Sequence, residues 1–240
     1  MKYYIASCVF TAKYPDLSKR ITDYVSFFPD IKIIRCCTPG WKVGIYEEKM
    51  PEDGFRDHWK SLPHTADFLP GDETYSLCAN CSNIIEESKP GTIVRSLWEL
   101  IDSDRNFVFP DYSGLKVTLQ DCWRSRDRAE THDAARSILR KMNIGFSEIA
   151  NNRENADFCG LSLYRPQVER NPRLAPRHYK DGAKGLFLPH TEEEQKKLML
   201  DHAREYKTGK VICYCHYCLE GLEAAGVDAT HLAAILFPEK

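Results

Sequence analysis

Short apolar runs alternate with longer stretches whose apolar residues recur every three to four positions. Runs of four to six apolar residues bounded by polar ones indicate β-strands, and β-branched and aromatic side chains favour them. The expected strands cover residues 3–6, 31–34, 74–77, 117–119 and 211–214, with a weaker one near 146–149.

The intervening stretches have helical periodicity. Ile93, Leu97 and Ile101 fall on one face of a helix predicted over 93–101. Thr191 followed by Glu194 predicts a capping box at the start of a long charged helix. The other helices are expected over 16–27, 131–142, 192–206 and 216–225. Alternating strands and helices predict an α/β fold with mostly parallel sheets.

The polar segment 102–114 separates two regions of similar layout, which we predict as halves 1–105 and 114–240. Each half begins with a strand that leads into a cysteine, Cys8 or Cys122, and has another cysteine segment in its middle. Each then closes with a CxxC that opens a helix, Cys78/Cys81 or Cys215/Cys218. The layout therefore predicts two pseudo-repeated α/β halves that arose by internal duplication.

Composition narrows the class of protein. With 240 residues, 42% hydrophobic, 28% charged and a net charge of −2, the chain is typical of a soluble globular protein. Near-neutral charge favours neither nucleic acid nor an anionic membrane as partner. There is no transmembrane segment of eighteen apolar residues and no apparent secretion signal, so we expect a cytoplasmic protein.

Ten cysteines are unusual for such a chain. In the cytoplasm, cysteines at this density favour metal or cluster binding over disulfides. If the sheets are parallel, the cysteines follow strands whose carboxyl ends share one edge, so sulfurs distant in sequence converge there. A CxxC at a helix N-terminus favours thiolates, and several thiolates together select zinc or an iron–sulfur cluster.

The cysteine segments also resemble a known family, the cysteine-rich CCG-domain proteins, over about residues 3–237. The first half resembles the B-type subunit of heterodisulfide reductase, and the second resembles iron–sulfur subunits of glycolate-, lactate- and glycerol-3-phosphate-oxidising enzymes. The matching stretches are Cys8, Cys36-Cys37-Thr38-Pro39-Gly40, Cys78-Ala79-Asn80-Cys81, Asp121-Cys122, Phe158-Cys159-Gly160 and Cys215-His216-Tyr217-Cys218.

This resemblance implies one or two [4Fe–4S] clusters, the first of a noncubane type at which a disulfide is reduced. The expected ligands of that first, catalytic cluster are Cys8, Cys36, Cys37, Cys78 and Cys81. Those of the second cluster are Cys122, Cys159, Cys215 and Cys218.

The second half departs from the family pattern. Phe158 stands where the family has the first cysteine of a pair, which leaves four motif cysteines. Four thiolates suit a cubane cluster or zinc better than a noncubane cluster. Cys213 is a less favoured fifth ligand, and its alternative role is that of a small core residue.

An insertion near 161–190 follows Gly160 and is locally basic. Its charges suit an anionic substrate or an acidic electron-carrier protein, and the alternative is a solvated loop. The basic residues are Arg165, Arg170, Arg173, Arg177, Lys180 and Lys184, against the acidic Glu169 and Asp181.

No ferredoxin cysteine run, dinucleotide fingerprint or P-loop accompanies these motifs. Electrons are therefore expected to pass to or from a separate protein that carries flavin or cubane clusters. The expected function is an oxidoreductase that reduces a disulfide or another sulfur substrate. The alternatives are a non-catalytic electron-transfer subunit that links a flavin dehydrogenase to a quinone or other acceptor, and a zinc-stabilised binding module.

Overall fold

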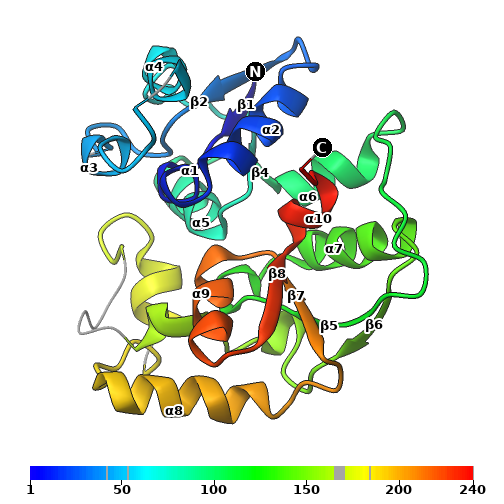
Figure 1. Cartoon of the computed structure of the whole chain (residues 1–240). Coiled ribbons are helices and arrows are strands. Elements are labelled where there is room, and N and C mark those ends of the chain that lie inside the picture. Colours follow the sequence, from blue (N-terminus) through cyan, green and yellow to red (C-terminus); the bar gives the residue numbers. More distant parts are fainter. Residues whose placement is uncertain (42, 53, 165–170, 184, 240) are drawn as a thin grey trace. The chain divides into compact units, whose positions relative to one another are not determined.

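The computed structural model describes residues 1–41, 43–52, 54–164, 171–183 and 185–239. Internal contacts divide the chain into two units, Met1–Leu100 and Ile101–Pro238 (Figure 1). Each unit contains one four-stranded sheet, and every strand pair in both sheets is parallel. The predicted α/β class with two halves and parallel sheets is confirmed.

The first unit has the strand order β2-β1-β3-β4, with Tyr4 of the central β1 opposite Ile33 and Tyr75. Its strands are β1 (Lys2–Ile5), β2 (Ile31–Ile34), β3 (Glu73–Ser76) and β4 (Ile93–Ser96). Its helices are α1 (Cys8–Lys13), α2 (Pro15–Val25), α3 (Gly44–Glu47), α4 (Gly54–Ser61) and α5 (Ala79–Ser88), and the division between units falls within α6 (Leu97–Ser103).

The second unit has the order β6-β5-β7-β8. Its strands are β5 (Lys116–Gln120), β6 (Gly145–Glu148), β7 (Lys210–Cys213) and β8 (Asp228–His231). Its α-helices are α7 (Ala129–Lys141), α8 (Glu192–Ala203), α9 (His216–Ala224) and α10 (Leu232–Leu236). Short 3-10 turns η1 (Trp123–Ser125), η2 (Arg153–Asn155) and η3 (Gly160–Leu163) and the π-helical turn η4 (Arg177–Asp181) complete it.

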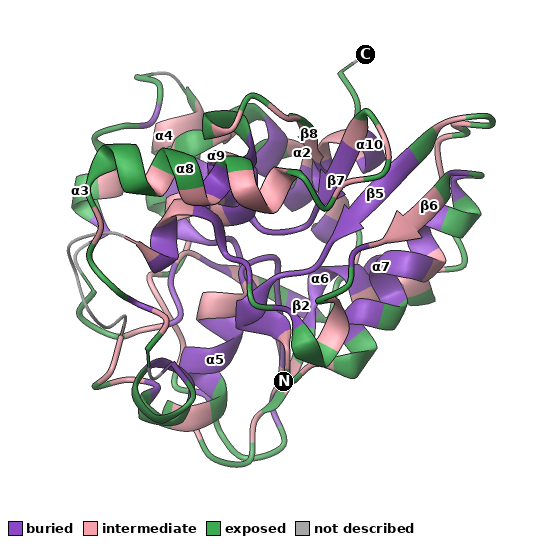
Figure 2. Cartoon of the chain, turned by 90° about the horizontal axis from the view of Figure 1, so that it is seen from below, coloured by how far each residue is buried: buried purple, intermediate pink, exposed green. Residues whose placement is uncertain are grey.

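Both units follow the same path, because in each sheet the first strand in sequence pairs with the second and the third, and the fourth lies outside the third. The central strands β5 and β7 are buried, whereas the edge strand β6 is partly exposed (Figure 2). Val117, Leu119 and Ile212 are fully buried, as expected for parallel strands covered on both faces.

The predicted helix over 93–101 is wrong in its first half. Ile93–Ser96 forms β4, which pairs with β3, and helix α6 begins only at Leu97. Ile93 and Val94 are β-branched and therefore suit a strand, and pairing with β3 satisfies their backbone groups. The apolar spacing of 93–101 arises from two elements in succession, which periodicity alone does not separate.

The edge strand β8 was not expected, because Asp228, Thr230 and His231 give it little apolar character. It forms by pairing with β7. The predicted capping box is confirmed: the Glu194 backbone N–H donates to the Thr191 hydroxyl, and the Thr191 N–H donates to the Glu194 carboxylate. None of the helices in the described ranges is long and apolar enough to cross a membrane.

Candidate metal centre

The cysteines occupy matching places in the two units. Cys8 and Cys122 follow the first strand of their sheet, and Cys78 and Cys215 follow the third. Cys36 and Cys37 come two and three positions after Ile34, the end of β2, whereas Cys159 lies eleven positions beyond Glu148, the end of β6. All ten cysteines are buried and none forms a disulfide.

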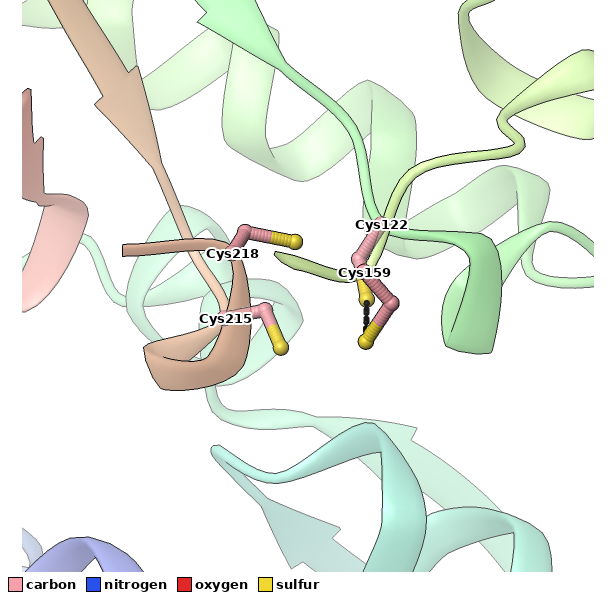
Figure 3. Close-up of side chains that lie close together, drawn as sticks. All are labelled: Cys122, Cys159, Cys215 and Cys218. Atoms are coloured by element: carbon pink, nitrogen blue, oxygen red, sulfur yellow. Dashed lines mark hydrogen bonds between the residues drawn. The ribbon is translucent and has the colours of Figure 1, made fainter. Parts of the chain in front are cut away.

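In the second unit, four sulfurs form one compact group. The Sγ atoms of Cys122, Cys159, Cys215 and Cys218 all lie within 4.8 Å of one another, and Cys122 Sγ lies 3.6 Å from Cys159 Sγ. Figure 3 shows the four side chains pointing toward one another, two from the start of helix α9 and two from the opposite segments. Four buried sulfur ligands can hold a metal ion or an iron–sulfur cluster.

Helix α9 brings two of these sulfurs together at its N-terminus. Cys215 is the N-cap residue in an extended conformation, and Cys218 is the third residue of the helix. A CxxC therefore spans the first turn, where unpaired N–H groups and the helix dipole favour negative charge. Cys78 is likewise the N-cap of α5 and Cys81 its third residue, so a CxxC also spans the first turn of a helix in the first unit.

The position of Cys159 depends on a close backbone approach by the next residue. Gly160 has a φ of +56°, and a Cβ on it would lie 1.8 Å from the Tyr217 carbonyl oxygen. A Cβ on Gly221 of α9 would in turn lie 2.5 Å from the Gly160 Cα. Two glycines thus allow η3 to contact α9 through backbone atoms, which places Cys159 beside the CxxC.

A buried ionic network holds the strand ends that carry the cysteines. The Asp121 carboxylate accepts hydrogen bonds from Arg136 at 2.5 Å, from the Tyr214 hydroxyl at 2.6 Å and from the Arg153 backbone N–H at 2.8 Å. Arg136 also donates to Glu148 at 2.6 Å. Burial acts to raise the pKa of Asp121, but Arg136 and the other donors hold it below its ordinary value.

Asp121 therefore links the segment before Cys122, the loop after β6 and the residue before Cys215. These contacts fix the backbone on both sides of the sulfur group. Because these partners come from elements far apart in sequence, only the folded unit shows which segments Asp121 joins.

A buried arginine contacts the sulfurs directly. Arg124 Nε lies 3.2 Å from Cys159 Sγ, and the Arg124 backbone N–H donates to Cys122 Sγ at 3.4 Å. The Ser162 hydroxyl donates to Cys159 Sγ at 3.3 Å and lies 3.4 Å from an Arg124 Nη. Cys159 thus accepts charge-assisted and neutral hydrogen bonds on one sulfur.

These contacts set which sulfur carries negative charge. Burial acts to raise the pKa of Cys159, but hydrogen bonds from the other three thiols and the positive charge of Arg124 hold it well below its ordinary value. Burial raises the pKa values of Cys122 and Cys218. Arg124 and the neighbouring thiols thus favour the thiolate form of Cys159, which is the form that metal ligation requires.

In the first unit, the cysteine thiols shift one another's pKa values in a continuous series. Cys8 acts on Cys36, Cys36 on Cys37, Cys37 on Cys81, and Cys78 on Cys81. That Cys8, Cys36, Cys37, Cys78 and Cys81 together hold one centre stays a prediction. In the described ranges, the compact metal-binding group is the four-cysteine group of the second unit.

Cys36 is the favoured thiolate of this series. Hydrogen bonds from the Cys37 and Cys8 thiols lower the pKa of Cys36 to about 3, whereas the hydrogen bond with Cys36 raises the pKa of Cys37 to about 12. The Thr38 backbone N–H also donates to Cys36 Sγ at 3.5 Å. The Cys36 backbone N–H donates to the His64 carbonyl at 2.8 Å, which anchors the segment after β2.

Phe158 and Cys213 lie outside the sulfur group. The Phe158 ring stacks on the His202 ring at 3.9 Å and 4°, in the position where the resemblance expected another sulfur. Cys213 Sγ contacts the Cys215 carbonyl oxygen at 3.7 Å and the Thr230 carbonyl oxygen at 4.0 Å. Burial raises the pKa of Cys213, in keeping with the alternative of a small core residue.

The insertion is more than a solvated loop where it is described. Tyr179 and Phe187 are buried, and both rings pack against Trp123 at 6.1 and 5.2 Å. Its described charges, Arg173, Arg177, Lys180 and Asp181, are exposed. The expected contributions of Arg165, Glu169, Arg170 and Lys184 lie outside the described residues.

The sequence did not single out Arg124, Ser162 or Gly221 as site residues. Arg124 stands two residues after Cys122, which is a usable signal, because residues that follow a parallel strand lie at the ligand-binding edge. Ser162 and Gly221 give no such signal.

Comparison with known proteins does not place the chain in a family. No family matches the sequence, and no curated protein matches it. The crystal structure of glutamate racemase isoform RacE1 from Bacillus anthracis is similar over 98% of this chain and 77% of that chain, with 11% identity and a TM-score of 0.36. A likeness of this size supports no argument about function.

Proposed function

We propose that this chain is an iron–sulfur redox protein with a metal centre in each unit. The observation that carries the proposal is the recurrence of buried cysteines at matching strand ends of two sheets with the same strand order. Nine such sulfurs on matching elements exceed what a single structural zinc requires. An iron–sulfur centre, once bound, supplies one-electron transfer.

The first unit is the proposed place of reaction. Cys8, Cys36, Cys37, Cys78 and Cys81 would hold its centre, and the substrate class is a disulfide or another sulfur compound. Reduction of a disulfide to two thiols takes up two electrons and two protons. A separate flavin- or cluster-bearing protein is the proposed electron donor.

The test begins with anaerobic purification and measurement of iron and labile sulfide per chain. We expect both to be present and the optical and electron paramagnetic resonance spectra to change when a disulfide is added to the reduced protein. Protein without iron and sulfide would refute the proposal. If the spectra do not change with any disulfide tried, the protein transfers electrons without catalysing disulfide reduction.

Zinc in the second unit is the second candidate. Sulfurs around a tetrahedral zinc with bonds of about 2.3 Å lie roughly 3.8 Å apart. The four sulfurs of the second group lie within 4.8 Å of one another, close to that spacing. Elemental analysis of anaerobic protein tests this candidate. Zinc at one per chain beside iron, lost in the Cys215→Ser/Cys218→Ser protein, assigns zinc to this group, and zinc alone favours a binding module.

A further inference from the structure

Arg124 carries a positive charge into the interior of the second unit. The side chain is 3% exposed, and burial of a charge is costly unless it is paired and hydrogen-bonded. Its guanidinium lies against the sulfur group, with Nε 3.2 Å from Cys159 Sγ and an Nη 3.4 Å from the Ser162 hydroxyl. The positive charge of Arg124 therefore lies in the same buried region as the four sulfurs.

Three aromatic rings fix the guanidinium in this place. Its carbon lies 5.1 Å from the Tyr179 ring centroid, 5.2 Å from that of Tyr217 and 5.7 Å from that of Phe187. Tyr217 comes from within the CxxC, and the other two come from the insertion. Cation–π contacts in a desolvated site stabilise a cation and restrict its movement. The insertion thus helps to hold a cation beside the sulfurs.

A centre with four thiolate ligands carries a net negative charge, which a fixed cation beside it would partly offset. Four thiolates around a divalent metal ion, or around a [4Fe–4S] core of charge +2, leave a net charge of −2. An added electron makes the charge more negative still. In a buried site of low effective dielectric constant, a cation in contact with the ligands offsets part of this charge.

We propose that Arg124 is a charge-compensating positioning residue for the Cys122/Cys159/Cys215/Cys218 centre. Its positive charge stabilises the thiolate ligands. Where the centre is iron–sulfur, a part that rests on the function proposed above, Arg124 raises the reduction potential because the reduced state carries the greater negative charge.

The test compares Arg124→Met, which removes the charge, with Arg124→Lys, which keeps it. Arg126→Met is the matched control, because Arg126 lies directly after the same turn but packs 4.3 Å over the Trp123 ring and donates to the Trp123 carbonyl. Each protein is reconstituted anaerobically and titrated with redox mediators. The signal of the second centre is identified by its loss in the Cys215→Ser/Cys218→Ser protein.

We expect Arg124→Met to lower the reduced-to-oxidised ratio of the second centre at least tenfold at a given potential, which is about 59 mV for one electron. In Arg124→Lys and Arg126→Met this ratio should stay within about threefold of the wild-type ratio, which is well below a tenfold change. A ratio in Arg124→Met within threefold of the wild type, or an equal fall in Arg126→Met, overturns the proposal. If Arg124→Met does not fold, the measurement on Arg124→Lys tests the proposal. A tenfold fall in its reduced-to-oxidised ratio would overturn the proposal.

If the wild type holds no iron, the proposed redox function fails, but the role of Arg124 is still measurable. Co²⁺ loaded into the protein reports thiolate ligation by its absorption, and a chelator competes for it. Arg124→Met should then retain Co²⁺ at least tenfold more weakly than the wild type, whereas Arg126→Met should not. Equal retention in all three proteins overturns the proposal.

Discussion

At the residue scale, the most demanding position in the second unit is Gly160. Its φ of +56° lies in the left-handed region, and a Cβ would overlap the Tyr217 carbonyl oxygen. The side chain of Cys159 therefore reaches the other sulfurs because the next residue has no side chain. Any larger residue must push η3 away from α9 or change the backbone conformation.

We predict that Gly160→Ala lowers the free energy of unfolding by about 3 kcal/mol or more, from left-handed strain and overpacking together. Gly226→Ala is the matched control, because Gly226 has a φ of +71° and a Cβ at that position would meet no atom within 4 Å. It should lose only about 1–2 kcal/mol from strain. Denaturant unfolding and metal content test this, and equal losses in the two variants would contradict the steric argument.

A second prediction at this scale concerns His202. Burial lowers its pKa from 6.5 to about 4, so the folded protein holds the ring neutral. Between these values the unfolded chain binds the proton more readily, and stability falls as the pH decreases from 6.5 to 4. At about 1.4 kcal/mol per pKa unit, this contribution amounts to about 3 kcal/mol.

Unfolding titrations at pH 7 and at about pH 4.5, within the window where the loss accumulates, measure this effect. His202→Gln removes the titrating group while keeping an N–H donor for Gln120, whose side-chain oxygen lies 2.7 Å from His202 Nε2. The variant should lose less stability on acidification than the wild type. The same loss in both proteins would show that other groups govern the acid sensitivity.

At the element scale, the carboxyl ends of β5 and β7 and the start of η2 are joined through Asp121. Its partner Arg136 lies in α7, and both side chains are almost completely buried. Removal of Asp121 would leave the buried Arg136 with only the partly exposed Glu148 as its ionic partner, and a buried charge that is incompletely paired is costly. The network thus connects these elements through hydrogen bonds. Its loss should make the segments that carry Cys122 and Cys215 less rigid.

Asp121→Asn is predicted to cost about 3–5 kcal/mol of stability and to weaken metal retention. Asp133→Asn is the control, because Asp133 forms an exposed ion pair with Arg153 at 2.8 Å and should cost less than about 1 kcal/mol. Chemical unfolding and chelator competition measure both effects. A cost in Asp121→Asn as small as in Asp133→Asn would show that the network does not hold these elements.

At the scale of the whole molecule, the two units have the same topology and their own cysteine sets. Cys78→Ser/Cys81→Ser is expected to empty the set of the first unit and Cys215→Ser/Cys218→Ser that of the second. Because metal binding is coupled to folding, each pair should expose its own unit to protease. Metal content and mass spectrometry of the fragments test this. If either double variant loses all metal, the two sets are not independent.

Much of the architecture follows from local sequence. Buried parallel strands are visible as short apolar runs, and cysteines that follow them must lie at one edge of the sheet. The division of 93–101 into β4 and α6 was not predictable, because Ile93, Leu97 and Ile101 keep a helical spacing across the boundary. Strand β8 was missed because pairing with β7, rather than its own composition, stabilises it.

The sequence by itself determined the repeated layout, the parallel α/β class and the CxxC at the start of α5 and of α9, since these depend on periodicity and on spacing within one turn. Only the tertiary structure decided which sulfurs form the compact group, that Phe158 stacks on His202 instead of joining it, and that Arg124 contacts Cys159. Those outcomes depend on distances between segments far apart in the chain. Packing and hydrogen bonding set such distances only when the chain is folded.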